Sequence, residues 1–542
     1  MLTKIKISFF TIALLASLGL FAQNYAHQQN VVEFLNRMAQ KGNIEIFDLV
    51  KPLERSKVYS LLTQLQSQQK LSSLEKKEVE FYIQLYTFDD LQSTVTAPGF
   101  SYPGHLPKYG APVFAYVDKD FRVMADPQIE ITKSVYDKKS TLLSSGFQLM
   151  GYAGKRLGFA IDYRDVNETG AYDSLRQDNI LPGINRKQTT SNNLLNYAQF
   201  NATLHYKLNK GMVSVGQDQH VIGYGKMGDI VLSNKAPSYP FVKLMYEPTR
   251  WLQFNYMHAW LQSGVLDSTQ TYSLGNTVYG GKRQQYIPKF LATHFVQIKI
   301  MKGLVVNAGE SIVYTDKLEL PYLIPISFFK AFDNSKFGDN ISSGANGQIF
   351  MGFSSRNQLP KTHLYGQVFI DEIRVGSIFN ESKSRNQWAY QLGASITDVY
   401  FPSLTLSAEY TRINPFVYRN FIPAQNYLSA NYSLGDWMGA NADRLYIGAS
   451  YKPNVKTGIK AYYVNQFKGG QRSVEYQYFA EPQPSFGIDP LYKNSQMGLE
   501  AYYQLYNNVS FKFIHSRTAQ LPYLQKGSSY STTSLGFCWS AF

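Results

Sequence analysis

The sequence predicts an all-β transmembrane barrel of about 18 antiparallel strands, preceded by a small N-terminal α-helical region. Three observations support this prediction. The chain of 542 residues begins like an exported protein, lacks any later apolar run that could form a membrane-spanning helix, and alternates apolar and polar residues over most of its length. An exported chain of this kind can still cross a membrane, because each strand of a barrel has one apolar and one polar face.

The first residues have the features of a secretory signal peptide. Lys4 and Lys6 precede an apolar run at residues 7–21, and Ala22 provides a small residue for cleavage. The run is shorter than the roughly 20 residues of a spanning helix, so an uncleaved anchor is the weaker interpretation. We therefore expect residues 1–22 to be a signal peptide cleaved near Ala22, and the mature protein to reside in a bacterial outer membrane.

The composition agrees with membrane-crossing strands. The chain contains 41 Tyr, 35 Phe and 39 Gly, while hydrophobic residues make up only 44% of it. Outer-membrane barrels concentrate aromatic residues at both membrane interfaces and keep half of each strand polar. The single cysteine, Cys538, excludes an intramolecular disulfide. The net charge of +14 favours lipopolysaccharide, anionic lipid or acidic glycans as partners over nucleic acid, although solvation of loops explains it equally well.

Helical spacing occurs only near the N-terminus. Apolar residues recur at intervals of three and four in residues 31–38, 58–65 and 79–86, and residues 72–75 form a capping-box pattern. We expect residues 23–105 to be a periplasmic helical region that can offer a surface to a periplasmic or motility partner.

Alternation with a period of two begins near residue 110, and we assign residues 106–542 to the barrel. In residues 252–260, for example, Leu, Phe, Tyr, His and Trp alternate with Gln, Asn, Met and Ala. A sheet this long must close to remove its edges, and strands of 9–11 residues with connections give on the order of 16 to 20 of them. The last strand ends in Phe542, and a terminal aromatic residue of this kind is a feature that the barrel assembly machinery reads.

A glycine-rich motif at residues 223–228 matches the G-x-G-x-x-G pattern of dinucleotide sites. Such a site needs a helix directly after the glycines, and Pro237 stops any helix within about two turns. We therefore expect no dinucleotide. The glycines instead predict a bend at the barrel rim, with Lys226, Asp229 and Asn234 as polar rim groups.

No pattern in the sequence predicts catalysis. The eight histidines occur singly, without the spacing of a metal site, and we expect neither a metal nor a cofactor. Asp371 and Glu372 are adjacent in a predicted strand, so their carboxylates point to opposite faces. We expect the protein not to be an enzyme, although an outer-membrane hydrolase is a remaining alternative.

Several ordered motifs resemble the Wzi-type capsule assembly family of outer-membrane proteins. The segment "GYGKMGDIVLSNKAPSYPFVKL" is similar to the central motif of that family. Further segments match in order at residues 254–261, 290–300, 309–326, 363–373, 409–418 and 439–453. The resemblance implies an outer-membrane barrel with a periplasmic helical region, acting as a surface lectin that attaches or organises capsular polysaccharide. The RemB-like branch of this family would add a role in gliding motility or cell-surface adhesion.

Candidate glycan contacts follow from residue chemistry, because sugars bind aromatic rings beside amide and charged groups. The candidates are Tyr224, Lys226, Asp229, Asn234 and Trp260. Structural roles at a rim explain the same residues. A porin or other transport channel remains the main alternative function.

Overall fold

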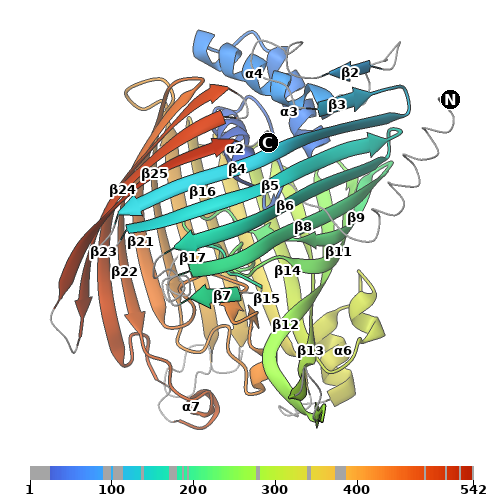
Figure 1. Ribbon diagram of the computed structural model, residues 1–542, viewed down its shortest axis with the longest axis vertical. Coiled ribbons are helices and arrows are strands. Elements are labelled where there is room, and N and C mark those ends of the chain that lie inside the picture. Colours follow the sequence, from blue (N-terminus) through green and yellow to red (C-terminus); the bar gives the residue numbers. More distant parts are fainter. Residues whose placement is uncertain are drawn as a thin grey trace.

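The computed structural model describes residues 25–89, 99–101, 114–135, 139–169, 180–185, 188–191, 194–275, 281–337, 344–372, 386–480, 484–506, 509–523 and 527–539. Within these ranges the chain forms a closed antiparallel barrel with three helices gathered at one end (Figure 1). The predicted signal peptide and the predicted terminal aromatic residue, Phe542, lie outside the described residues.

The barrel wall, as far as the chain is described, has eighteen long strands. They are β4 (Phe121–Val135), β5 (Lys139–Ala153), β6 (Leu157–Thr169), β8 (Leu194–Leu208), β9 (Gly211–Asp218), β11 (Tyr239–Thr249), β12 (Leu252–Ser273), β13 (Lys282–Met301), β14 (Leu304–Thr315), β15 (Asn346–Arg356), β16 (Thr362–Glu372), β17 (Gln387–Thr397), β18 (Leu404–Ile413), β21 (Ala442–Asn454), β22 (Thr457–Gly469), β23 (Pro490–Tyr506), β24 (Val509–Pro522) and β25 (Ser528–Trp539). Each pairs antiparallel with the next. β25 closes the ring against β4, where Ser534 Oγ lies 2.7 Å from Ser134 Oγ. The expected fold class is therefore confirmed.

The described chain also contains seven short strands. β2 (Gly99–Ser101), β3 (Phe114–Val117) and β7 (Gln188–Ser191) extend the wall at its margins. β1 (Val50–Lys51) pairs with β10 (Val221–Ile222), and β19 (Leu428–Ser429) pairs with β20 (Tyr432–Ser433).

The predicted alternation places polar side chains inside the barrel and apolar ones outside. On β12, Gln253 and Asn255 are buried in the interior, whereas Trp260 is on the outward face and 37% exposed. On β23, Met497, Leu499 and Tyr503 are exposed on the outer face. A barrel surrounded by lipid needs this arrangement, because apolar atoms must meet the hydrocarbon.

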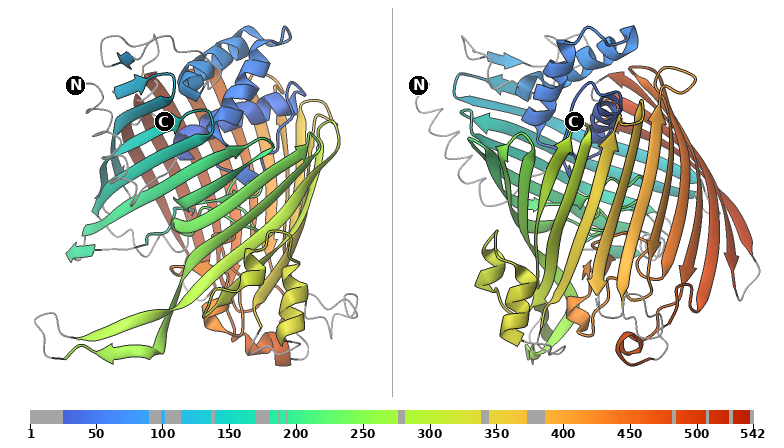
Figure 2. Two further views of the ribbon diagram at one scale, coloured as in Figure 1. Left: turned by 90° about the vertical axis from the view of Figure 1, so that its right-hand side faces the viewer. Right: turned by 180° about the vertical axis from the view of Figure 1, so that it is seen from behind.

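The two ends of the barrel differ in their connections. At one end the strands are joined by short turns, for example residues 154–156, 209–210, 302–303 and 455–456; we call this the short-turn end. At the other end, the long-loop end, the connections are longer and include residues 414–441 and 470–489. Helices α2 (Tyr25–Gln40), α3 (Arg55–Gln66) and α4 (Ser73–Tyr86), with the 3-10 turn η2 (Thr87–Asp89), cover the short-turn end (Figure 2).

The helices pack as the apolar spacing predicts. Their facing side chains form one core that includes Val31, Phe34, Leu35, Met38, Val58, Leu61, Leu62, Leu65, Val79 and Tyr82. The capping box is also confirmed, because the Glu75 backbone N–H donates to Ser72 Oγ at 3.3 Å and the Ser72 N–H donates to Glu75 Oε2 at 2.8 Å.

Ion pairs join the helical region to the barrel. Arg356, at the end of β15, donates to Asp48 Oδ2 at 2.7 Å, and both side chains are buried. Lys452 on β21 lies 3.0 Å from Glu78 and donates to the Tyr82 hydroxyl at 2.7 Å. The helical region is therefore attached to the short-turn end by specific polar contacts as well as by covalent connection.

A third connection involves Lys41, which bridges Glu75 at 2.5 Å and Asp398 at 2.7 Å in the turn between β17 and β18. Burial acts to raise the pKa of Asp398, but hydrogen bonds from Lys41 and the Ser403 N–H outweigh it, so this pKa lies below the ordinary value of 3.8. Burial likewise acts to lower the pKa of Lys41, but the hydrogen bonds to both carboxylates hold this pKa above 10.5.

The docking of the helical region should therefore depend on pH in a defined window. A lowered carboxylate pKa stabilises the docked state above about pH 4 and loses that effect as the pH falls further, while the raised lysine pKa stabilises it below about pH 10.5. We expect the midpoint of helix melting, followed by circular dichroism, to fall at both extremes. Asp398→Asn should flatten the acidic side of the profile, and an unchanged acidic side in that variant would contradict the assignment.

One helix lies on the outside of the barrel. The 3-10 turn η3 (Leu320–Leu323) and α6 (Phe329–Phe337) cover the outward faces of β12, β13 and β14 near the long-loop end (Figures 1 and 2). Glu310 on β14 accepts hydrogen bonds from the backbone N–H groups of Phe329 at 2.6 Å and Lys330 at 3.3 Å. His294 Nε2 lies 3.2 Å from the same carboxylate. Helix α6 thus covers the charged side chain of Glu310 on the outer wall. Glu310 in turn caps the first turn of α6.

Glu310→Gln should release α6 from the wall without unfolding the barrel. The amide loses the charge that favours a helix N-terminus, a change of about 1 kcal/mol. We expect faster hydrogen exchange in residues 329–337 at unchanged barrel stability. Glu319→Gln is the control, since Glu319 contacts Lys336 at the surface, and equal exchange in both variants would refute the role of Glu310.

Candidate functional site

The glycine-rich motif lies inside the barrel. Residues 221–236, which we call the inner hairpin, follow β9 and turn back on themselves, with the Ile222 N–H donating to Leu232 O at 2.8 Å. The Gly223 N–H donates to Leu49 O at 2.9 Å, in the segment between α2 and α3. Ile230, Val231 and Leu232 are buried. The expected position at the barrel rim is therefore wrong, because the hairpin folds inward and packs in the interior.

A second segment from the long-loop end enters the barrel and meets the hairpin. Residues 414–441, which we call the inner loop, contain the pair β19–β20 and the turn η5 (Pro423–Gln425). The hydroxyl of Tyr418 donates to Ile230 O at 2.6 Å, and the hydroxyl of Tyr427 donates to Val231 O at 2.9 Å. The Ser233 N–H donates to Leu434 O at 2.7 Å.

The two inner segments form an apolar core with the adjoining wall. Its buried members come from the hairpin, from the loop and from the interior faces of β11 to β21, including Tyr224, Ile230, Val231, Leu232, Phe241, Met257, Leu291, Phe295, Phe350, Tyr365, Phe369, Tyr418, Tyr427 and Leu434. A water-filled pore needs polar walls, and this side of the interior is instead packed like a protein core. The barrel interior is thus filled from β11 round to β21.

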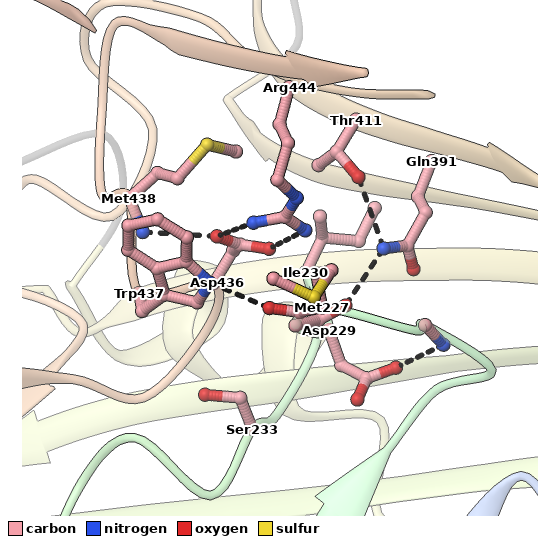
Figure 3. A network of polar contacts seen from close by, with 12 residues as sticks. Met227, Asp229, Ile230, Ser233, Gln391, Thr411, Asp436, Trp437, Met438 and Arg444 are labelled. Atoms are coloured by element: carbon pink, nitrogen blue, oxygen red, sulfur yellow. Dashed lines mark hydrogen bonds and ion pairs between the residues drawn. The ribbon is translucent and has the colours of Figure 1, made fainter. Parts of the chain in front are cut away.

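A buried ionic cluster fastens the inner loop to the wall (Figure 3). Arg444 on β21 donates to both carboxylate oxygens of Asp436, at 3.1 and 2.8 Å, and lies 3.6 Å from Glu409 on β18. All three side chains are 0% exposed. Glu409 also accepts hydrogen bonds from the Lys226 backbone N–H at 2.8 Å and the Tyr365 hydroxyl at 2.6 Å, so the cluster holds the hairpin as well.

The glycines of the motif allow this close packing. A Cβ on Gly225 would lie 1.9 Å from Gly228 O, and one on Gly228 would lie 2.5 Å from Asp436 Oδ2. Gly228 O accepts a hydrogen bond from the Gln391 side chain at 2.8 Å, and Met227 O accepts one from the Trp437 indole at 2.6 Å (Figure 3). The glycines therefore let the inner hairpin pack closely against the inner loop and the wall in the barrel interior.

The five predicted glycan contacts are not brought to one surface. Tyr224 and Asp229 are buried in the hairpin, where Asp229 Oδ1 accepts the Gly225 N–H at 2.7 Å. Lys226 has an exposed side chain, and Asn234 is half-buried. Trp260 lies on the opposite side of the wall, facing outward. The first four thus share the hairpin, whereas Trp260 belongs to the outer aromatic surface.

The long-loop end carries a second cluster that sequence reasoning missed. We call it the aromatic cap: Arg419 and Phe421 of the inner loop with Arg472, Tyr476 and Phe479 around α7 (Glu475–Phe479). Arg419 donates to Arg472 O at 2.6 Å, and the Arg472 guanidinium lies 5.5 Å from the Tyr476 ring centre. The three aromatic side chains are exposed. The only signal in the sequence is their presence in long connections, which a Tyr-rich composition makes common.

Neither a metal-binding cluster nor a membrane-spanning helix is found among the described residues. In these ranges no three side chains of His, Cys, Asp or Glu come together as a metal site would require. Nor do the described helices include one with the length and apolar character needed to cross a membrane.

Comparison with known proteins rests on structure. No family model and no curated protein sequence matches the chain. Among solved structures, it is similar to Wzi of Escherichia coli, which is described as an outer membrane protein involved in group 1 capsule assembly and as a carbohydrate-binding β-barrel. The TM-score is 0.55 and the sequence identity is 13%. The match covers 96% of this chain and 99% of that one. OpdO of Pseudomonas aeruginosa gives a TM-score of 0.41 at 12% identity, covering 77% and 95% of the two chains. The outer membrane protein OprD of the same organism gives 0.40 at 11%, covering 77% and 92%.

At this level of identity the similarity to Wzi shows a shared fold. It extends over nearly the whole of both chains, so it covers the helical region as well as the barrel. The closed sheet, its outward apolar face and this match agree with one another. The chain therefore has a Wzi-like fold, that of an outer-membrane β-barrel.

Proposed function

We propose that the protein binds or organises surface polysaccharide, capsular polysaccharide above all, through its long-loop end. The observation that carries the proposal is the filled interior: the inner hairpin and inner loop form an apolar core there, and the same inner loop contributes Arg419 and Phe421 to the aromatic cap. Outer-membrane barrels have short periplasmic turns and longer extracellular loops. On the basis of this rule we assign the aromatic cap to the cell surface and the helical region to the periplasm.

The chemistry of the aromatic cap suits a sugar polymer. Exposed rings such as Tyr476 and Phe421 offer apolar faces for the C–H groups of a sugar. Arg472 and Asp489, 2.7 Å apart, supply donors and acceptors for hydroxyl groups. The carbohydrate binding described for Wzi supports the same interpretation. The five candidates Tyr224, Lys226, Asp229, Asn234 and Trp260 are secondary, because only Lys226 combines an exposed side chain with a position inside the barrel.

Binding of fluorescently labelled capsular glycan to cells with and without the protein tests the proposal. The double substitution Phe421→Ala with Tyr476→Ala should weaken binding at least about tenfold, since stacked rings contribute around 1 kcal/mol each beyond buried area. Trp251→Ala, which removes an exposed ring at the short-turn end, should leave binding unchanged. Loss of the gene with no change in capsule retention or in glycan binding would refute the proposal.

A transport channel is the competing function. The filled side of the interior predicts little or no steady conductance for the native protein in planar bilayers. A stable open conductance, with no glycan binding, would favour the channel. A requirement for the protein in spreading on surfaces would extend the proposal to gliding motility or adhesion, with the helices as the surface for a periplasmic or motility partner.

A further inference from the structure

A basic cavity lies at the short-turn end, on the side of the barrel away from the aromatic cap. It has a volume of about 50 Å³ and lies between the start of α3 and the interior faces of β5, β6, β8, β9 and β11. Five basic residues line it: Arg55, Lys155, Arg156, Lys207 and Lys243. Only two acidic residues do so: Glu54 and Asp218. The proposed glycan surface makes no use of this cavity.

The wall places its polar groups in adjoining rows. Lys243 on β11 is directly opposite Ser214 on β9, which is opposite His205 on β8 and then Gly158 on β6. Thr203 lies two residues before His205 and therefore on the same interior face of β8. Gly158 has no side chain, and the Tyr152 ring lies beside it, 3.1 Å from where a Cβ would stand.

Two buried groups of this wall lack a partner within the described chain. Lys243 is 9% exposed, yet its ammonium has no carboxylate at ion-pair distance and no hydrogen-bond acceptor, only the Phe241 ring at 6.0 Å. Thr203 Oγ1 is buried without a hydrogen bond. Native proteins satisfy nearly all buried polar groups, so an unpaired ammonium and hydroxyl beside a cavity indicate a missing acceptor.

The other basic side chains of the lining already have partners of differing strength: Lys207 donates to Ser56 Oγ at 3.2 Å, and Arg156 donates to Asn209 Oδ1 at 3.3 Å. Arg55 is bound to Asp89 at 2.7 Å, so it belongs to the helical region. Lys155 and Arg156, in the turn between β5 and β6, are exposed at the rim. Glu54, the N-cap residue of α3, also lines the cavity and accepts a hydrogen bond from the Ser56 hydroxyl.

We propose that this cavity binds a phosphate group that enters from the short-turn end. The ammonium of Lys243, the hydroxyl of Thr203 and the imidazole of His205 line one space and provide donors from several directions, which a tetrahedral anion with several acceptor oxygens can use at once. The exposed rim lysine and arginine attract the anion, and Lys243 holds it in the interior. The phosphate belongs either to a phosphorylated sugar or to a phospholipid head group.

Isothermal titration calorimetry on the full-length protein in zwitterionic detergent tests the site, with inorganic phosphate, a hexose 1-phosphate and phosphatidylglycerol in mixed micelles as probes. The native protein should bind at least one of the three at low salt. Tighter binding of the sugar phosphate identifies a glycan source, and tighter binding of the lipid identifies a membrane source; both outcomes support the site. Binding of none of the three would overturn it.

Single substitutions distinguish phosphate binding in this cavity from non-specific attraction of phosphate to a basic protein. Lys243→Met should weaken phosphate binding at least about tenfold, and Thr203→Val by about threefold to tenfold. Lys460→Met is the matched control, because Lys460 is also an interior lysine but lies on β22, outside the cavity. Equal affinities for the native protein and Thr203→Val would refute the assignment even if the lysine variant failed to fold. Glycan binding at the aromatic cap should be unchanged in all of them, which keeps the two proposals separate.

Discussion

Arg444→Met should lower the free energy of unfolding by about 3–5 kcal/mol, the usual cost of leaving buried carboxylates without their cation. The substitution keeps most of the side-chain volume but removes the bidentate contact with Asp436 and the 3.6 Å approach to Glu409. Because Asp436 belongs to the inner loop, we expect that loop to detach from the wall. Urea unfolding, followed by the shift in gel mobility between folded and unfolded barrel, measures the loss.

Arg472→Met is the matched control for this experiment. Arg472 also pairs with an aspartate, Asp489, but the two side chains are 39% and 48% exposed. Water screens an exposed pair, so its loss should hardly move the unfolding midpoint. If both variants shifted the midpoint equally, burial of the Arg444 cluster would not be the cause. A channel conductance that appears only in Arg444→Met would show that the inner loop blocks the interior.

Arg356→Met should detach the helical region from the barrel. Arg356 contacts Asp48 at 2.7 Å and Asn36 at 3.2 Å, and its loss leaves the Asp48 carboxylate buried and uncompensated. A cost of about 3 kcal/mol corresponds to a roughly 100-fold larger open population. We expect residues 25–89 to become about 100-fold more sensitive to proteolysis, because cleavage follows the open population when opening is fast.

Lys299→Met provides the comparison for the helical region. Lys299 binds Glu45, only three residues from Asp48, at the same 2.7 Å distance, but this pair is partly exposed. We expect less than about a fivefold change in proteolysis, in line with a surface ion pair. A similar effect of the two substitutions would mean that the apolar contacts of the helices, and not the buried ion pair, hold the region in place.

Much of the fold follows from local patterns. The alternation in residues 252–260 predicted which side chains of β12 point outward, because a strand has a period of two whatever its surroundings. The capping box at residues 72–75 and the three apolar runs predicted the helices for a similar reason. Closure of the sheet was predictable as well, because a long open edge would be unstable.

The position of the glycine-rich motif was not predictable in this way. Residues 223–228 have no helical or strand period, and glycines suit a rim and a packed interior equally. Their place depends on Glu409 and Asp436, which lie about 180 and 210 residues away in the sequence and meet the hairpin only after the barrel has closed.

The sequence by itself thus determined the strand pattern, the interior and exterior faces and the N-terminal helices, all of which depend on neighbours a few residues apart. Only the tertiary structure decided that two connections fold into the barrel, that an ionic cluster around Arg444 secures them, and that Lys243 and Thr203 share a cavity. The physical reason is that burial and pairing of charges are set by contacts distant in the chain, and local periodicity carries no information about which distant segments meet.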